Sequence, residues 1–187
     1  MNNSRNRLRY IILAAIFSAL MAISAWFKIP LPPTMTPVTL QVMFVLFTGL
    51  LLPPVYAFAA QAVYVFIGLV GLPVFTEGGG FAYVLKPTFG FLIGFILAAW
   101  LIALLVKHMK SRNIFLLFLT ALFGVLIIYL VGVPYGYIIF NRVLGMDWSL
   151  NQVILAFCTL YLPIDIVKAL IAATIAFAVQ KRLPKNI

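Results

Sequence analysis

Asp165 and Lys168 are the residues of this chain whose types and spacing are best suited to chemistry. They lie three positions apart in the apolar segment YLPIDIVKAL, so a helix would place them on the same face. A charged residue in a membrane segment costs roughly 2.5–3.5 kcal/mol even on lenient insertion scales. The two side chains could simply neutralise each other, or they could present an acceptor and a donor to a polar ligand. We favour a ligand site, because the pair is expected on the same side of the membrane as two unusual loops.

Few other residues suggest chemistry. Cys158 is the single cysteine and His108 the single histidine, so no intrachain disulfide and no cysteine–histidine metal cluster can form. The sequence contains no GxxxxGK[ST], HExxH or GxSxG motif. We therefore expect a binding protein that is not an enzyme, has no metal or other cofactor and does not itself hydrolyse ATP.

Two loops are expected to border the ligand site. The segment KIPLPPTMTP (28–37) has four prolines in ten residues, which make its backbone stiff. The segment TEGGGFAYVLKP contains Gly78, Gly79 and Gly80, which allow positive φ and close approach of the backbone to another group. This second loop leads directly into a membrane helix, which makes it a suitable place for a small ligand at the membrane edge.

Three further polar residues lie within apolar segments. Thr39 and Gln41 occur in PVTLQ, and at that depth their polar groups need partners, which could be the ligand or other protein groups. Tyr129 could line a pocket, or it could anchor a helix end at the membrane interface. The sequence leaves both alternatives open.

The composition predicts that helices in a membrane position these residues. Of the 187 residues, 65% are hydrophobic and only 9% are charged, which is too little polar material for a soluble domain. The apolar runs are continuous and about 15–21 residues long, unlike the alternating segments of a membrane β-barrel. We expect one all-α membrane domain, residues 1–187, with six transmembrane helices. Their expected bounds are Arg9–Trp26, Val38–Leu52, Val55–Leu72, Pro87–Val106, Ile114–Val133 and Pro163–Val179.

The basic residues predict the orientation of these helices. Nine of the thirteen lysines and arginines fall on one side, and all three acids fall on the other. Because cytoplasmic segments are enriched in Lys and Arg, both termini are expected to be cytoplasmic. Topology and contact with lipid thus account for most of the net charge of +10, without binding to nucleic acid. The nine residues are Arg5, Arg7, Arg9, Lys107, Lys110, Arg112, Lys181, Arg182 and Lys185.

The segment Tyr135–Leu162 is too long for a simple turn. Its apolar run Val153–Leu162 is too short to span a membrane, so we expect an outer cap with a helical portion. Asp165 is expected in the first turn of the sixth helix, where the helix dipole favours a carboxylate. The ligand site is therefore expected at the outer side, formed by loops 28–37, 73–87 and 135–162 and by the sixth helix.

Small residues predict close helix contacts. Gly90 and Gly94 in the fourth helix have the small-xxx-small spacing that lets a neighbouring helix approach. Ala15 and Ala19 in the first helix have the same spacing. This alanine pair could pack inside the bundle, or it could form a docking face for another membrane protein.

Three segments together resemble a known family. They are PVTLQVMFVLFTGLLLPP, GLVGLPVFTEGGGFAYVLKPTFGFLIGF and YLPIDIVKA, in the order and spacing of the biotin-binding S component (BioY family) of energy-coupling-factor (ECF) transporters. The resemblance covers nearly the whole chain. It implies a six-helix S component in a prokaryotic cell membrane that captures biotin from the external side with high affinity. It also implies partners, namely a transmembrane T component and two cytoplasmic ATPase subunits.

The resemblance gives several residues a role. The Asp and Lys of the sixth-helix motif, here Asp165 and Lys168, would contact biotin. A carboxylate only accepts hydrogen bonds and suits the ureido N–H, whereas an ammonium only donates and suits the ureido oxygen or the carboxylate of biotin. Ala15 and Ala19 would match the AxxxA motif that docks to the T component. Residues of the glycine segment would reach the biotin rings through backbone or stacking contacts, namely Phe75, Gly78, Gly79, Gly80, Phe81 and Tyr83.

The chain departs from the family pattern at a few positions. Lys86 and Phe89 stand where the fourth-helix motif usually has glycine, and Pro53 and Ile164 replace glycines elsewhere. Lys86 could supply a further cation for the biotin carboxylate, or it could extend to the membrane interface. These departures bear on pocket geometry more than on the fold. The alternative functions are an S component for another small vitamin and a stand-alone biotin facilitator without ATPase partners.

Overall fold

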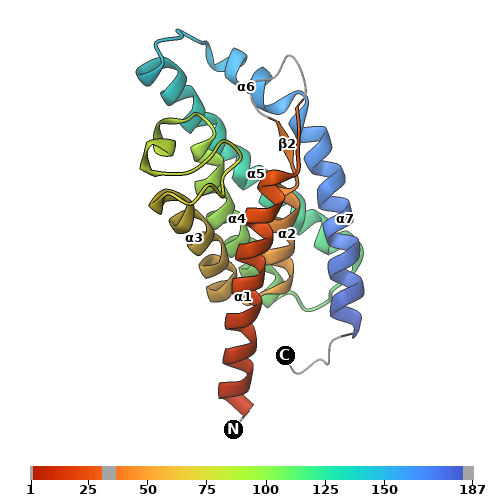
Figure 1. Ribbon diagram of the computed structural model, residues 1–187. Coiled ribbons are helices and arrows are strands. Elements are labelled where there is room, and N and C mark those ends of the chain that lie inside the picture. The colour runs from red at the N-terminus through yellow and green to blue at the C-terminus, as the bar shows by residue number, and fades with distance from the viewer. Residues whose placement is uncertain (1, 31–36, 183–187) are drawn as a thin grey trace.

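Helices dominate the computed structural model, which describes residues 2–30 and 37–182 (Figure 1). Within these residues, four helices are long and apolar enough to cross a membrane, and two further apolar helices are shorter. The four long ones are α1 (Asn2–Trp26), α4 (Phe89–His108), α5 (Ile114–Ile138) and α7 (Tyr161–Arg182). The two shorter apolar helices are α2 (Gln41–Leu51) and α3 (Pro54–Val70), and the 9-residue helix α6 (Leu150–Cys158) precedes α7.

Small elements close the end of the bundle opposite the termini (Figure 1). The strand β1 (Lys28–Ile29) pairs antiparallel with β2 (Val38–Thr39). The 3-10 helix η1 (Phe81–Leu85) precedes α4, and the π-helical turn η2 (Ile139–Val143) continues α5. Of the predicted proline loop 28–37, residues 31–36 lie outside the described part of the chain.

The close approach predicted at Gly90 and Gly94 is confirmed by the packing of α4 on α5. A Cβ atom on Gly90 would lie 2.3 Å from Cβ of Tyr135, and one on Gly94 would lie 3.0 Å from Cα of Ile128. Gly132 of α5 receives the Phe91 ring in the same way, with a Cβ-to-ring distance of 2.6 Å. Glycines from both helices thus hold α4 and α5 together and fix the orientation of Phe91 beside Tyr129.

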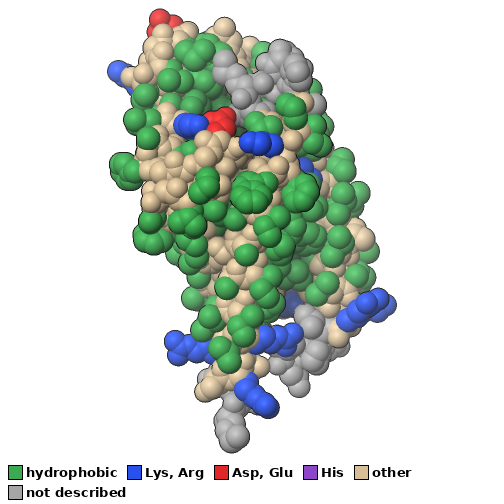
Figure 2. Space-filling view, in the orientation of Figure 1, with side chains coloured by type: hydrophobic (Ala, Val, Ile, Leu, Met, Phe, Trp, Pro, Cys, Tyr) green, Lys and Arg blue, Asp and Glu red, His purple; other side chains and the backbone are tan. Residues whose placement is uncertain are grey.

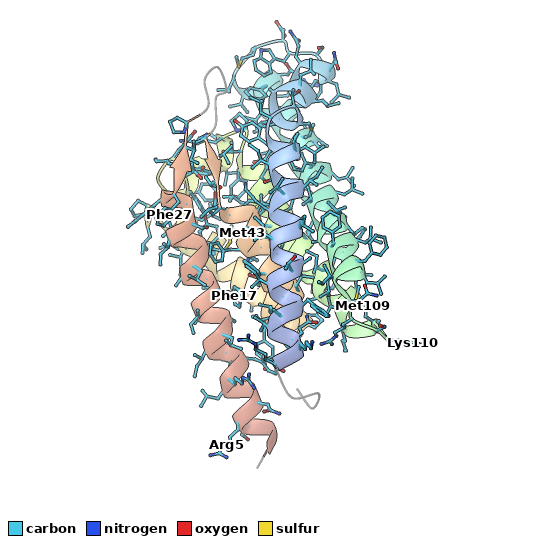
Figure 3. The ribbon with its side chains drawn as sticks, turned by 90° about the vertical axis from the view of Figure 1, so that its right-hand side faces the viewer. Arg5, Phe17, Phe27, Met43, Met109 and Lys110 are labelled. Atoms are coloured by element: carbon cyan, nitrogen blue, oxygen red, sulfur yellow. The ribbon has the colours of Figure 1, made fainter. Side chains whose placement is uncertain are left out.

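Basic side chains gather at the end of the molecule where both termini lie (Figure 2). Arg5 and Lys110 lie toward this end, whereas Phe27 lies toward the other (Figure 3). At the same end the Gln180 side chain of α7 donates from Nε2 to the Leu50 carbonyl near the end of α2, at 2.7 Å. Lys185, the ninth cation of the predicted set, lies outside the described residues.

The observed bounds correct several expected ones near the N-terminus. The first helix begins at Asn2 rather than Arg9, because its arginines are exposed and are good helix formers that extend the helix beyond its apolar part. The second begins at Gln41 rather than Val38, because Val38 and Thr39 pair with β1 instead. The resulting α2 has only 11 residues.

The later helices also differ from expectation. α4 begins at Phe89 rather than Pro87, since the Lys86 carbonyl accepts from the Phe89 N–H and closes a turn before the helix. α5 continues through Pro134 to Ile138 rather than ending at Val133. α7 begins at Tyr161, and Pro163 fits its first turn because N–H groups there have no intrahelical partner.

The placement of Asp165 in a first helical turn was therefore wrong. Asp165 is the fifth residue of α7, beyond the turn where free N–H groups would favour a carboxylate. Its partners are side chains instead, as described below. The helical portion predicted for the segment Tyr135–Leu162 is confirmed as α6, which a capping box of Ser149 and Gln152 begins.

Candidate ligand-binding site

A cavity lies near the pairing of β1 with β2, between the helices α2, α4, α5, α6 and α7 and the segments that carry Thr39, Thr76 and Tyr83. Its polar lining consists of Thr39, Gln41, Thr76, Glu77, Thr88, Asp165 and Lys168. Its aromatic lining consists of Tyr83, Phe91, Phe95, Tyr129, Phe157 and Tyr161. Aromatic walls with a few convergent polar groups are typical of a site for a small organic molecule.

Asp165 and Lys168 form a buried ion pair in the wall of this cavity. Asp165 Oδ1 lies 2.8 Å from Lys168 Nζ, and the side chains are 6% and 10% exposed. The Tyr129 hydroxyl donates to Asp165 Oδ2 at 2.8 Å, and Lys168 Nζ also donates to the Thr39 carbonyl at 2.7 Å. An ammonium has three N–H groups and a carboxylate about four lone-pair sites. Among the described contacts, therefore, one Lys168 N–H and part of the Asp165 carboxylate are available to a ligand.

Tyr129 thus lines the pocket rather than anchoring α5 at the membrane interface. It is 8% exposed, and its ring packs edge-on against Phe91 with centroids 5.7 Å apart. Its hydroxyl orients one oxygen of Asp165, which leaves the other oxygen directed at Lys168. Tyr129 is therefore placed to fix the geometry of the ion pair.

Gln41 joins the segments that surround the cavity through hydrogen bonds within the protein. Its Oε1 accepts from the hydroxyls of Thr39 and Thr76, both at 3.0 Å. Its Nε2 donates to the Tyr64 hydroxyl at 2.7 Å, and Tyr64 donates in turn to the Val74 carbonyl at 3.1 Å. Of the two alternatives for this polar pair, internal hydrogen bonding accounts for most of the Gln41 amide, although Gln41 also borders the cavity.

The glycine loop, residues 71–80, positions two residues of the cavity lining through its backbone turn. Phe75 and Gly78 exchange two backbone hydrogen bonds at 2.9 and 3.2 Å, and Gly78 has φ 108°, which glycine adopts readily. A Cβ atom on Gly79 would lie 2.1 Å from the Leu72 carbonyl oxygen. Gly78 and Gly79 do not line the cavity, but their turn places Thr76 and Glu77 there.

The aromatic residues of this region separate into two groups. Phe75 is 2% exposed and packs between Tyr64 and Tyr83, at centroid distances of 5.5 and 4.6 Å. Tyr83 lines the cavity, and its burial raises the pKa of its phenol, so it is neutral at physiological pH. Phe81 is 78% exposed and does not line the cavity, and Lys86 also lies outside the lining.

The family model that matches this chain is that of the BioY family, and the match extends over residues 1–185. The chain belongs to the BioY family. The resemblance that the three sequence segments indicated is therefore confirmed.

Individual BioY relatives support the same assignment. A protein named "Probable biotin transporter BioY" from Lysinibacillus sphaericus is 45% identical over 157 residues, covering 79% of each chain. The "Biotin transporter BioY" of Thermotoga maritima is 36% identical over 178 residues, covering 93% of this chain and 97% of that one. The chain is thus similar to these BioY proteins along most of their length.

A solved structure agrees with the fold. It is described as a crystal structure at 2.1 Å of the S-component for biotin from an ECF-type ABC transporter. It matches with a TM-score of 0.85 and 26% identity, and covers 98% of this chain and 95% of that one. The chain therefore has the helical membrane fold of an S component.

Several lining residues were not identified as site residues from the sequence. Thr76 and Glu77 belong to the predicted loop 73–87, and Phe91 and Phe157 lie in apolar runs in which a phenylalanine carries no distinguishing signal. The edge-to-face contact of Phe91 with Phe157, with ring centroids 5.0 Å apart, joins α4 to α6 in the cavity wall. No periodicity in the sequence could have shown this contact, because it depends on how the cap folds back over the bundle.

Proposed function

We propose that this BioY-family chain is the substrate-binding S component of a biotin uptake transporter. The observation that carries the proposal is the ion pair of Asp165 and Lys168, which lines a cavity and has hydrogen-bonding capacity to spare. The names of the relatives and of the matching structure support biotin as the ligand.

The cavity chemistry fits the groups that biotin presents. The ureido N–H groups would donate to Asp165, and the third N–H of Lys168 would donate to the ureido oxygen. The sulfur-containing ring and the alkyl tail are apolar, and the rings of Phe91, Phe95 and Phe157 offer a matching surface. Biotin would thereby complete the hydrogen bonding of two charged groups that are otherwise costly inside a membrane protein.

We propose that residues 1–187 form one membrane domain in which α2 and α3 complete a set of six transmembrane helices. The concentration of described basic residues at the end that carries both termini supports a cytoplasmic location for that end. The cavity would then open to the outside. We expect a thiol reagent that cannot cross membranes to label Met146→Cys in intact cells, in a Cys158→Ser background. Ser111→Cys should be labelled only after permeabilisation, and the reverse pattern would invert the topology.

The binding measurement that tests the function uses purified protein in detergent. We expect saturable binding of labelled biotin, with no competition from an excess of riboflavin or thiamine. Competition by another vitamin with greater affinity would instead identify an S component of different specificity. Absence of any biotin binding by folded protein would contradict the proposal.

We further propose that transport requires a transmembrane T component and two cytoplasmic ATPase subunits. The description of the matching structure as part of an ECF-type ABC transporter supports such partners. Proteoliposomes that contain the chain alone should accumulate less biotin than those that contain the complete complex and ATP. Equal uptake in both would favour a stand-alone facilitator.

A further inference from the structure

A second ion pair lies at the rim of the cavity, outside the set of contacts used above. Lys86 Nζ lies 2.6 Å from Glu77 Oε2 and also donates to the Glu77 backbone carbonyl at 3.4 Å. The ammonium is 5.0 Å from the centre of the Tyr83 ring. Both charged side chains are 38% exposed, so water reaches the pair.

Only one of the two residues in this rim ion pair is part of the cavity lining. Glu77 lines the cavity, whereas Lys86 does not. A molecule in the cavity therefore meets the carboxylate, and Lys86 acts on that molecule through Glu77. Lys28 of β1 holds the same turn, because its Nζ donates to the carbonyl of Thr76 at 3.0 Å. Figure 2 shows acidic atoms between two basic side chains on this face of the molecule.

The rim ion pair changes the net charge that a ligand meets in the cavity. Asp165 and Lys168 cancel each other, so Glu77 would leave the described lining with one net negative charge. A negative lining repels a ligand that carries a carboxylate, and Lys86 removes this repulsion because its ammonium contacts Glu77 directly.

We propose that Lys86 determines the charge specificity of the cavity by cancelling the carboxylate of Glu77, so that an anionic ligand is accepted. The inference rests on the proposed function, since the carboxylate in question is that of biotin. Lys86 is a positioning and charge-compensating residue that does not need to touch the ligand.

The test compares biotin with biotinamide, which lacks the negative charge, on purified protein in detergent. We expect Lys86→Gln to weaken biotin binding about threefold to fivefold, as for a partly exposed charge pair, and to change biotinamide binding less than about twofold. Glu77→Gln breaks the same ion pair but should tighten biotin binding, because it removes the carboxylate from the lining and leaves the Lys86 ammonium uncompensated. The affinity of the variant that combines Lys86→Gln and Glu77→Gln for biotin should lie within about twofold of that of the unsubstituted protein.

The opposite effects of the two single substitutions separate charge compensation from a structural link. If the ion pair only held the loop in place, Lys86→Gln and Glu77→Gln would weaken both ligands alike, and that result would overturn the inference. The inference would also be overturned if no variant differed from the unsubstituted protein in its affinity for biotin or for biotinamide. Lys110→Gln, which removes one cation at the opposite end, is the matched control and should bind both ligands normally (Figure 3). If the unsubstituted protein bound neither ligand, that result would instead contradict the proposed function, and the inference would fail with it.

Discussion

Asp165→Asn is expected to weaken biotin binding at least tenfold, which corresponds to about 1.4 kcal/mol. The substitution leaves Lys168 without its buried counter-ion and replaces one carboxylate oxygen by an amide group that donates. That group would meet either the Lys168 ammonium or the Tyr129 hydroxyl, which both donate to Asp165 in the native chain. Equilibrium binding of labelled biotin to the purified variant measures the effect.

Asp147→Asn is the matched control for this experiment. Asp147 is exposed, lies outside the cavity lining and has φ 48°, a conformation that asparagine also tolerates. Its affinity for biotin should equal that of the unsubstituted protein. Because loss of folding would also abolish binding, the Asp165→Asn protein must show the same elution volume and helical circular dichroism. Normal affinity in a folded Asp165→Asn protein would exclude Asp165 from direct recognition.

Replacing Ala15 and Ala19 together by leucine is expected to reduce the recovery of the complex with the T component at least tenfold. Both alanines are exposed on α1, while Ala14, Ser18 and Met21 form the buried face of the same helix. The alanine pair is therefore not used to pack the described bundle, which supports docking of a partner helix there. Leucine side chains would prevent the close backbone approach that small residues permit. Co-purification with a tagged T component and the ATPases measures recovery.

Biotin binding by the isolated double variant should remain normal, because neither alanine lines the cavity. Ala178→Leu places the same side chain at an exposed position of α7 and serves as the control for added bulk. Full recovery of the complex with the Ala15/Ala19 variant would show that the partner docks elsewhere on the chain.

The sequence predicted the parts of the fold that depend on local physics. Long apolar runs identified the helices, and glycine spacing identified the contact that α4 makes with α5 at Gly90 and Gly94. The charged pair of Asp165 and Lys168 was recognisable because two ions within one apolar turn need partners. The structure places both in a cavity, as the sequence interpretation of a ligand site requires.

The sequence could not predict features that depend on contacts between distant segments. The start of α2 moved to Gln41 because Val38 and Thr39 pair with a strand ten residues earlier. Gln41 itself accepts from Thr76, 35 residues away, and no local pattern distinguishes that contact from a contact to ligand. Lys86 was ambiguous for the same reason, since its partner Glu77 is brought close only by the fold of the glycine loop.

The length of α2 indicates the distance between the cavity and the end of the bundle that carries Gln180. Gln41 and Val42, at its first turn, form part of the cavity, and its last turn reaches the end that carries Gln180. Its 11 residues rise about 16 Å, roughly half of a ~30 Å hydrocarbon core. With the orientation proposed here, the cavity would lie about 16 Å from the cytoplasmic end of α2, so biotin bound there would already have entered the bilayer before any ATP is consumed. The ATP-dependent step would then need to open only the part of the bundle between the cavity and that end.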